Sequence, residues 1–274
     1  MPELPEVETV VRDLRELLVG KQFAAIRCVR RDLRKPWNVD WNAILVGETV
    51  ESIRRRGKWI VMHLTSSQEL LFHLGMTGQL TVTKADAAIL DHTHLLFDLA
   101  NTDQQLRFRD IRRFGSATLF ANAEAVEVFI GKTLGSEPFE LTDKAFHTSV
   151  TATKRNLKAI LLDQHVVAGV GNIYADEALF RAKLHPGKLG CDMTLAECKR
   201  LRKAIVEVLN HAIENRGSSI RNYVGGSGLK GGFQNEFRVY GRTGEPCPRC
   251  ETPIEMVRLA QRSSHYCPQC QRAE

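Results

Sequence analysis

The sequence predicts an α+β protein of several domains, in which an N-terminal helix and a β-sandwich precede a helical domain and a small cysteine-bearing hairpin. Apolar residues first recur at helical spacing, then fall into short β-like runs up to residue 121, and then return to helical spacing. Four cysteines stand in two C-x2-C pairs near the C-terminus. A chain of 274 residues has room for about two domains and a small appendage.

The first helix is predicted from Val7 to Leu18, because its apolar residues keep the i, i+3, i+4 rhythm of an amphipathic helix. Gly20 follows as a helix stop. The stretch that leads into this helix reads MPELPEVETV. One interpretation is structural: Pro5 presets the backbone of the first turn, and the neighbouring glutamates suit the positive end of the helix dipole.

The alternative interpretation is that the N-terminus is a chemical reagent. If Met1 is removed, Pro2 carries a secondary amine, and an α-amino group is partly unprotonated at neutral pH. Such an amine can attack an electrophilic sugar carbon and form an iminium, while Glu3 moves protons beside it. Residue chemistry alone leaves both interpretations open.

Short β-like runs with polar turns between them indicate a β-sandwich or barrel up to about residue 130. The runs are QFAAIRCV, TVESIRRR, KWIVMHL, ELLFHLG, QLTV, HTHLLFDL, QQLRFRD and SATLFA. We expect four segments: the N-terminal domain over residues 1–130, a helical domain over 131–222, a glycine-rich connection over 223–240 and the hairpin over 241–274.

The helical domain contains two long stretches of helical pattern. The first, NLKAILLDQHVVAGVGNIYADEALFRAKLHP, breaks at AGVGN and so predicts a helix–turn–helix arrangement. The second, TLAECKRLRKAIVEVLNHAIENRG, ends at Gly217. The segment YVGGSGLKGGFQN that begins at Tyr223 is rich in glycine and predicts a mobile loop.

The cysteine pattern C-x2-C-x16-C-x2-C has the spacing of a tetrahedral zinc site. A pair of disulfides would need an oxidising compartment that nothing else in the sequence supports. We therefore expect one structural Zn²⁺ per chain, held by four thiolates, and no organic cofactor. The four ligands are Cys247, Cys250, Cys267 and Cys270, while the scattered Cys28, Cys191 and Cys198 are expected to be reduced core thiols.

The charge balance suggests a polyanionic partner, because 38 Lys and Arg against 32 Asp and Glu leave a net charge of +6. The acidic N-terminus is unlike a signal peptide. No apolar run approaches the roughly 18 residues that cross a membrane. These features predict a soluble cytoplasmic protein with no membrane attachment.

Basic residues gather in RRRGK, where strand alternation would place Arg54, Arg56 and Lys58 on one face. That face is either a solvated edge or a phosphate contact. Asn172 directly precedes a helical stretch after a glycine-rich turn, which makes it an N-cap candidate. A helix N-terminus of this kind also suits a phosphate, so the role of cap alone and the role of cap plus anion site both stay open.

Three further side chains have a structural and a functional interpretation. Phe114, beside the arginines of DIRRFG, is either a buried strand residue or a wedge for a base stack. Met76 in HLGMTG is similarly either a core residue or a wedge. His73, like His92 and His94, lies in a strand-like run without a predicted metal partner.

Taken together and in this order, MPELPEVETV, RRRGK, HLGM, DIRRFG, GVGNIYADEALF and the four-cysteine finger resemble the bacterial formamidopyrimidine-DNA glycosylase family. The resemblance spans almost the whole chain. It implies a helix–two-turn–helix domain after the β-sandwich, and a zinc finger that grips DNA. It also implies a monomer in the bacterial cytoplasm, associated with the chromosome. Relatives of the endonuclease VIII branch have a glycine where this chain has Leu4.

The activity that this resemblance implies is base-excision repair of double-stranded DNA containing an oxidised base or an abasic site. The enzyme removes 8-oxoguanine and formamidopyrimidines through a Schiff base on the N-terminal proline, and it cleaves the strand by β,δ-elimination. Two alternatives are an enzyme of the same fold that prefers oxidised pyrimidines and a zinc-stabilised DNA-binding module without catalysis.

The resemblance also assigns roles to individual residues. Pro2 corresponds to the nucleophile and Glu3 to the adjacent acid/base. The catalytic positions that hold phosphates are Lys58 and Arg262, joined in DNA binding by Asn172. The positions that fill the opened duplex are Met76, Arg112 and Phe114, with Arg112 facing the orphaned cytosine. The remaining DNA contacts are His73, Lys158 and Tyr240, and the lesion-pocket positions are Glu6, Ser219, Ile220, Arg221 and Tyr223.

Three positions depart from patterns common in the family. Thr77 stands where some relatives have an acidic residue that helps to read the base. Ile111 replaces a frequent proline, and Arg216 replaces a frequent glycine. These departures bear on lesion contacts rather than on the type of reaction.

Overall fold

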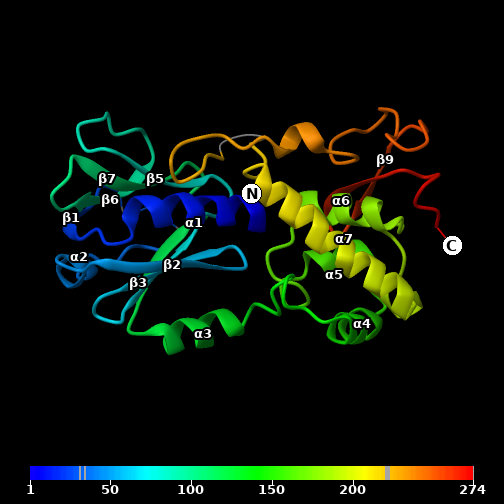
Figure 1. Ribbon diagram of the computed structural model, residues 1–274, viewed down its shortest axis with the longest axis horizontal. Helices are drawn as coiled ribbons and strands as arrows, with labels where there is room; N and C mark the ends of the chain where they lie inside the picture. The colour runs from blue at the N-terminus through cyan, green and yellow to red at the C-terminus, as the bar shows by residue number, and fades with distance from the viewer. Residues whose placement is uncertain (31, 34, 220–222, 274) are drawn as a thin grey trace. The chain divides into compact units, whose positions relative to one another are not determined.

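The computed structural model describes all residues except 31, 34, 220–222 and 274. The predicted lesion-pocket residues Ile220 and Arg221 therefore lie outside the described residues. The chain forms two compact units. The first unit contains Met1–Lys132 and Asn215–Gly232, and the second contains Thr133–Glu214 and Phe233–Glu274 (Figure 1).

Helix α1 (Leu4–Leu18) begins three residues before the predicted Val7. Its N-terminus is fixed by a reciprocal capping box between Glu3 and Glu6, with Pro5 in the first turn. Gly20 follows the helix with φ of +81°, a conformation that glycine adopts at little cost. The apolar face of α1 is fully buried in the core of the first unit.

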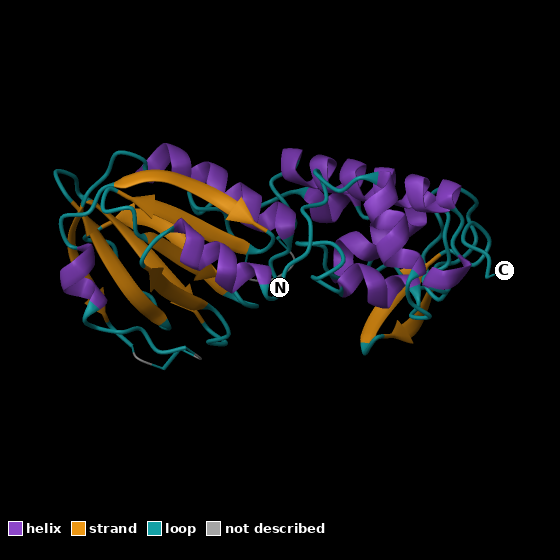
Figure 2. Ribbon diagram, turned by 90° about the horizontal axis from the view of Figure 1, so that it is seen from below, coloured by secondary structure: helices purple, strands orange, loops and turns teal. Residues whose placement is uncertain are grey.

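Two antiparallel four-stranded sheets form the predicted sandwich (Figure 2). One sheet has the order β1 (Phe23–Cys28), β6 (Thr93–Leu99), β7 (Gln104–Asp110) and β5 (Gly78–Lys84). The other has the order β2 (Val50–Arg56), β3 (Trp59–Leu64), β4 (Glu69–His73) and β8 (Ser116–Phe120). Each strand overlaps one of the predicted runs. The short helices α2 (Trp41–Leu45) and α3 (Ala123–Gly131) were not anticipated.

The two sheets face each other across an aromatic core, which confirms the sandwich. The ring of Phe72 on β4 lies 6.1 Å from that of Phe97 on β6 and 5.7 Å from that of Phe108 on β7, as measured between centroids. All three side chains are fully buried. The chain passes from one sheet to the other three times, through the β1–β2, β4–β5 and β7–β8 connections.

The second unit is helical and ends in a β-hairpin. Its helices are α4 (Asp143–Thr151), α5 (Leu157–Leu162), α6 (Asn172–Ala182) and α7 (Leu195–Glu214), with short 3₁₀ turns at Gly190–Asp192 and Phe233–Glu236. The predicted break at AGVGN separates α5 from α6. The hairpin consists of β9 (Glu255–Leu259) and β10 (Arg262–Tyr266), and β10 packs against α6.

The glycine-rich segment that was predicted to be mobile is held against α1 over residues 223–232. The Asp13 carboxylate on α1 accepts hydrogen bonds from the Ser227 hydroxyl at 2.7 Å and from the Arg216 guanidinium at 2.7 Å. The Gly226 carbonyl accepts the Val82 amide of β5 at 3.0 Å. A Cβ at Gly225 would lie 2.5 Å from the Asp13 carboxylate. Glycine at this position therefore lets the backbone of the segment approach α1 closely.

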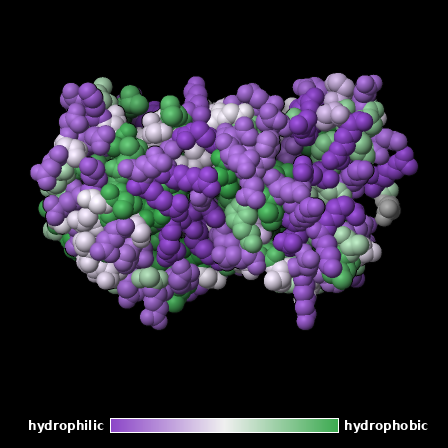
Figure 3. Space-filling model, viewed as in Figure 1, coloured by the Kyte–Doolittle hydropathy of each residue, from purple (hydrophilic) through white to green (hydrophobic). Residues whose placement is uncertain are grey.

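The surface is predominantly hydrophilic on the face shown in Figure 3, where apolar side chains form small scattered patches. Cys191 is exposed in its 3₁₀ turn and Cys28 is half-buried, so of the three cysteines predicted to be core thiols only Cys198 is buried. In the described part of the chain, no helix combines the length and the apolar character needed to cross a membrane.

The Asp13 contact gives a pH-dependent contribution to stability. Burial by itself would raise the pKa of Asp13, but hydrogen bonds from Arg216 and Ser227 outweigh it and hold the pKa below its usual value. A carboxyl group with a lowered folded-state pKa stabilises the fold above its unfolded-state pKa of about 3.9, and the contribution is lost as the pH falls through the folded-state value.

We therefore expect Asp13→Asn to lower the free energy of unfolding by about 1–2 kcal/mol at pH 7. The difference from wild type should shrink below about pH 4, where the wild-type carboxylate is itself protonated. Urea unfolding at several pH values measures both. The exposed Asp86, replaced by Asn, serves as the control. An Asp13→Asn effect that stays constant down to pH 2 would contradict this account.

Candidate functional site

A cluster of buried charged groups surrounds the N-terminus of α1. Pro2, Glu3 and Glu6 are all buried, whereas Met1 is 55% exposed. The Glu6 carboxylate accepts the Glu3 amide at 2.8 Å through one oxygen. Its other oxygen accepts the amide and the hydroxyl of Ser218, at 2.8 and 3.0 Å. A single carboxylate thus joins the start of the chain to a segment more than 200 residues away.

The approach of that segment requires glycine at position 217. Gly217 has φ of +69°, and a Cβ there would lie 2.8 Å from a Glu6 carboxylate oxygen. Any side chain would therefore displace either the backbone or the carboxylate. Gly217, which the sequence marked only as a helix stop, is also the residue that lets Ser218 reach Glu6.

Lys58 joins this cluster from the turn between β2 and β3. Strand β2 ends at Arg56, and Gly57 turns the chain with φ of +57°, so Lys58 does not share the predicted strand face with Arg54 and Arg56. The Lys58 side chain is buried instead. Burial lowers the pKa of the Lys58 ammonium below its usual value, while the charges of Glu3 and Glu6 act in the opposite direction.

This arrangement provides acid–base groups beside the N-terminus. Two carboxylates and a lysine of lowered pKa share one low-dielectric region next to Pro2, where proton transfers between such groups are strongly affected by small changes of charge. The structure thus brings together Pro2, Glu3, Glu6 and Lys58, which lie on two different elements.

Two of the predicted lesion-pocket residues are engaged in holding the backbone. The Tyr223 hydroxyl donates to the Glu6 carbonyl at 3.1 Å, and burial raises the pKa of this phenol. The Ser219 hydroxyl donates to the Tyr223 carbonyl at 3.0 Å and accepts the Gly231 amide at 2.8 Å. Both residues shape the segment beside Glu6.

Three exposed side chains lie on two of the connections between the sheets, β4–β5 and β7–β8. Met76 is 37% exposed and Phe114 is 44% exposed, although both are large apolar side chains. The guanidinium of Arg112 lies 5.0 Å from the centroid of the Phe114 ring. Phe114 is therefore not the buried strand residue of the structural interpretation.

His73 lies behind these side chains and is uncharged at neutral pH. Burial, with the charges of Lys58 and Lys35, lowers the pKa of His73 to about 4. Its Nδ1 accepts the Gly75 amide at 3.0 Å, so the ring proton resides on Nε2. If His73 contacts DNA, it does so as a neutral hydrogen-bond donor rather than as a cation.

Lys158 was predicted to contact DNA, but its side chain is fully buried in the second unit. Its ammonium donates to the Asp176 carboxylate at 2.5 Å and to the Asn172 carbonyl at 2.9 Å. A lysine enclosed in this way supports the N-terminus of α6 from inside. Its contact with DNA stays a prediction.

Asn172 is the first residue of α6, and Gly171 is its N-cap, so the predicted N-cap is displaced by one position. The Asn172 side-chain carbonyl is buried and finds no hydrogen-bond partner among the described residues. The first turn of α6 contains the orphan backbone amides of a helix N-terminus, which suit an anion.

Two acidic residues of α6, which the sequence interpretation did not single out, connect this helix to the hairpin. The Asp176 carboxylate accepts the amide of His265 on β10 at 2.9 Å. The Glu177 carboxylate accepts the amides of Arg238, Val239 and Tyr240, at 2.9 to 3.1 Å. The signal in the sequence was an Asp–Glu pair inside an otherwise apolar helix. These contacts position Tyr240 and the strand that begins with the exposed Arg262.

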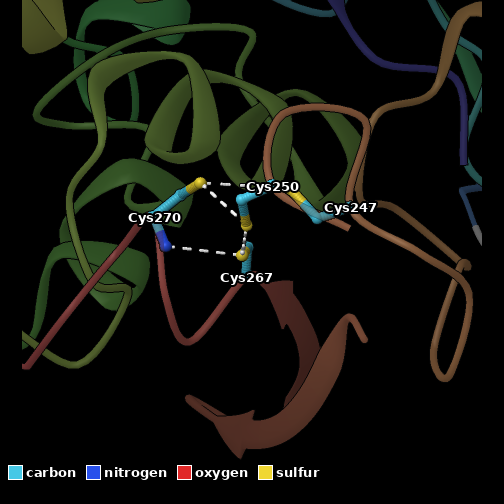
Figure 4. Close-up of side chains that lie close together, drawn as sticks. All are labelled: Cys247, Cys250, Cys267 and Cys270. Carbon is cyan, nitrogen blue, oxygen red and sulfur yellow. Dashed lines mark hydrogen bonds between the residues drawn. The ribbon is translucent and has the colours of Figure 1, made fainter. Parts of the chain in front are cut away.

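The four predicted metal ligands lie together at the base of the hairpin (Figure 4). Their sulfur atoms are all within 4.8 Å of one another, and the Sγ atom of Cys250 is 3.4 Å from those of Cys267 and Cys270. Four sulfurs about 2.3 Å from a tetrahedral zinc ion would be separated by about 3.8 Å. Burial raises the pKa of the Cys267 and Cys270 thiols, whereas hydrogen bonds from Thr252 lower that of Cys250 to about 6. Four cysteines placed in this way suit a tetrahedral metal ion such as zinc.

Three models of known protein families match successive parts of this chain. Residues 1–117 match the formamidopyrimidine-DNA glycosylase N-terminal domain, residues 134–224 match the H2TH domain of those enzymes, and residues 244–273 match a zinc finger found in FPG and IleRS. The chain belongs to the formamidopyrimidine-DNA glycosylase family. The resemblance proposed from the sequence motifs, and the fold that it implied, are therefore confirmed.

Individual members of the formamidopyrimidine-DNA glycosylase family match over their full length. The enzyme of Desulforamulus reducens is 41% identical over 278 residues, and the alignment covers 100% of both chains. The enzyme of Geobacillus kaustophilus is 42% identical over 279 residues and covers 99% of this chain. The alignment covers 100% of that enzyme.

Solved structures of the family are also closely similar. A Lactococcus lactis mutant enzyme in complex with DNA containing Fapy-dG has a TM-score of 0.92 at 36% identity, over 99% of this chain and 100% of its own. The Lactococcus lactis enzyme in complex with DNA containing an abasic site has a TM-score of 0.91 at 36% identity, with the same coverage.

We expect Cys250→Ser to release the metal and unfold the hairpin, because a unit this small is not stable without its metal. Metal content and affinity for duplex DNA should both fall. The exposed Cys191, replaced by Ser, is the matched control, since it removes a thiol outside the cluster. Full DNA affinity in metal-free Cys250→Ser would contradict the expectation.

We expect Lys158→Met to lower the free energy of unfolding by about 3–5 kcal/mol, because it leaves the Asp176 carboxylate buried without the lysine. Urea unfolding with saturating zinc measures the loss. Lys203→Met removes a lysine that is 75% exposed and should change stability by no more than about 0.5 kcal/mol. Equal effects of the two substitutions would rule out a special role for the buried pair.

Proposed function

We propose that this protein is a base-excision repair DNA glycosylase and abasic-site lyase that removes oxidised purines from double-stranded DNA. The observation that carries the proposal is the burial of Glu3, Glu6 and Lys58 around the N-terminal proline. Family membership supports glycosylase activity. The relatives crystallised with Fapy-dG and abasic DNA support damaged duplex as the substrate.

In this proposal the free amine of Pro2 is the nucleophile, which requires that Met1 be removed. The amine attacks C1′ of the damaged nucleotide, and a C–N bond forms as the bond to the base breaks. The base leaves with the electron pair and takes up a proton. Loss of the amine proton and opening of the sugar ring at O4′ produce the iminium. Glu3 transfers protons to and from the sugar oxygen.

Strand cleavage follows from the iminium because it acidifies the protons at C2′. Removal of one such proton expels the 3′ phosphate, and a second elimination expels the 5′ phosphate, which is β,δ-elimination. The low pKa of Lys58 and the carboxylate of Glu6 tune the protonation of the groups around Pro2. Hydrolysis then returns the proline amine.

The base must leave the duplex before the amine can reach C1′, at a cost of a few kcal/mol. We infer that Met76, Arg112 and Phe114 occupy the opened duplex, because two exposed apolar groups and an arginine project together there. Asn172 and Arg262 provide phosphate contacts from the second unit, and Lys58 one from the first. The protein acts as a monomer with one Zn²⁺ in its four-cysteine site.

Borohydride trapping tests the chemistry. Protein that begins at Pro2 is mixed with a duplex containing 8-oxoguanine opposite cytosine, and mass analysis should find the reduced adduct on the N-terminal peptide. The same protein with Met1 retained is the control and should give no adduct, because its proline nitrogen is an amide.

If the protein is trapped on, and cleaves, only duplexes with oxidised pyrimidines, the proposed preference for purines is wrong. The proposed mechanism at Pro2 is then retained. Absence of any adduct and of any cleavage with 8-oxoguanine, oxidised-pyrimidine and abasic duplexes would leave a DNA-binding module without catalysis. An adduct on a lysine rather than on the N-terminal peptide would reject Pro2 as the nucleophile.

A further inference from the structure

The three projecting side chains of the first unit come from two separate connections between the sheets. Met76 lies in the β4–β5 connection, whereas Arg112 and Phe114 lie in the β7–β8 connection. Side chains on independent loops would have to be ordered separately whenever they enter a duplex, and each ordering step costs conformational entropy. The structure contains a group of contacts that joins these two connections.

The contact is made by Thr77 and Asp110. The Thr77 hydroxyl donates to one oxygen of the Asp110 carboxylate at 2.5 Å and accepts the amide of Arg112 at 2.9 Å. The other Asp110 oxygen accepts the Gly115 amide at 2.7 Å. Asp110 is fully buried, so these bonds are shielded from water. The Arg112 amide also approaches the first Asp110 oxygen, at 3.3 Å. Thr77, which follows Met76, and Arg112 and Gly115, which flank Phe114 in the chain, are therefore bound to the same carboxylate.

The backbones of the two connections also touch. Gly75 has φ of +59°, and a Cβ at this position would lie 2.5 Å from the Gly115 nitrogen and 2.6 Å from the Phe114 carbonyl carbon. The backbone of Asp110 is also held in place, since its carbonyl oxygen accepts a hydrogen bond from Nε2–H of the buried His94 at 3.0 Å. The connection that carries Met76 is thus packed directly against the one that carries Phe114.

We propose that Thr77 and Asp110 are positioning residues that fix Met76, Arg112 and Phe114 as one preset wedge for the opened duplex. The inference rests on the proposed function. It assigns Thr77 a role other than reading the base, because a threonine hydroxyl has one proton and this proton is given to Asp110. The wedge is ordered before DNA arrives, so the binding free energy of a lesion duplex is not reduced by ordering two loops.

The variants Thr77→Val and Thr77→Ser separate the hydroxyl from the shape of the side chain. Valine keeps the volume and removes both hydrogen bonds, whereas serine keeps the hydroxyl. The probe is a duplex with a tetrahydrofuran abasic analogue opposite cytosine and 2-aminopurine next to that cytosine. An undamaged duplex of the same sequence reports phosphate contacts alone.

We expect Thr77→Val to bind the abasic duplex roughly tenfold more weakly than wild type, as loss of a hydrogen bond to a charged group implies. Its affinity for undamaged duplex should be unchanged. At saturating protein the rise in 2-aminopurine fluorescence should be smaller, because the neighbouring base is less fully unstacked. Thr77→Ser should restore both values. A purely structural role would lower the unfolding temperature without changing the signal of the saturated, folded protein.

Retention of the wild-type fluorescence and lesion preference by Thr77→Val would overturn the inference, as would equal losses in Thr77→Ser and Thr77→Val. Absence of any preference for the abasic duplex in wild type would contradict the proposed function itself. Hydrogen exchange of the wild-type protein tests the contact even if Thr77→Val does not fold. The amides of Arg112 and Gly115 should be protected without DNA, and rapid exchange of both would reject the preset wedge.

Discussion

The carboxylate of Glu6 is the contact on which the rest of the first unit's site depends. It is buried at the N-terminus of α1, where the helix dipole and three backbone or hydroxyl donors compensate for the loss of water. One donor belongs to Glu3 and the others to Ser218, so the same group fixes the N-terminal residues and the segment after Gly217. The positive charge of Lys58 is placed against this negative region, and burial then makes the lysine a weaker base. The carboxylate therefore joins parts of the chain that nothing in the local sequence brings together.

The second unit is also held together by buried carboxylates that accept backbone amides from distant parts of the chain. Asp176 and Glu177 are adjacent on α6 and both are buried, yet their carboxylates point to different partners. Asp176 joins Lys158 of α5 to His265 of the hairpin, and Glu177 accepts three consecutive backbone amides before the zinc site. The finger is also attached through Arg249, whose guanidinium lies 4.2 Å from the centroid of the Phe180 ring on α6. These contacts attach the finger to α6.

The sequence does not predict contacts between a residue of common type and a partner that is distant in sequence. Thr77 was identified as a departure from the family pattern, but its bond to Asp110 depends on two inter-sheet connections meeting at one end of the sandwich. The family resemblance assigned Lys158 to the DNA contacts, and only the packing of α5 against α6 shows that its side chain is enclosed. The glycine-rich segment resembled a mobile loop for a similar reason. Its glycines are also what lets the backbone approach Asp13 and Leu14 on α1.

The sequence by itself determined the order of the elements, the helical and strand periods, the four clustered cysteines and the family. These are properties of local pattern: an apolar repeat, a cysteine spacing or a run of consecutive residues can be recognised without knowing what lies opposite. Only the tertiary structure decided which charged groups are buried, which loops are tied together and which apolar side chains stay exposed. Those outcomes depend on desolvation and on hydrogen bonds between residues such as Glu6 and Ser218, which are 212 positions apart. A pattern along the chain does not contain such pairings, because folding, rather than proximity in sequence, brings the partners together.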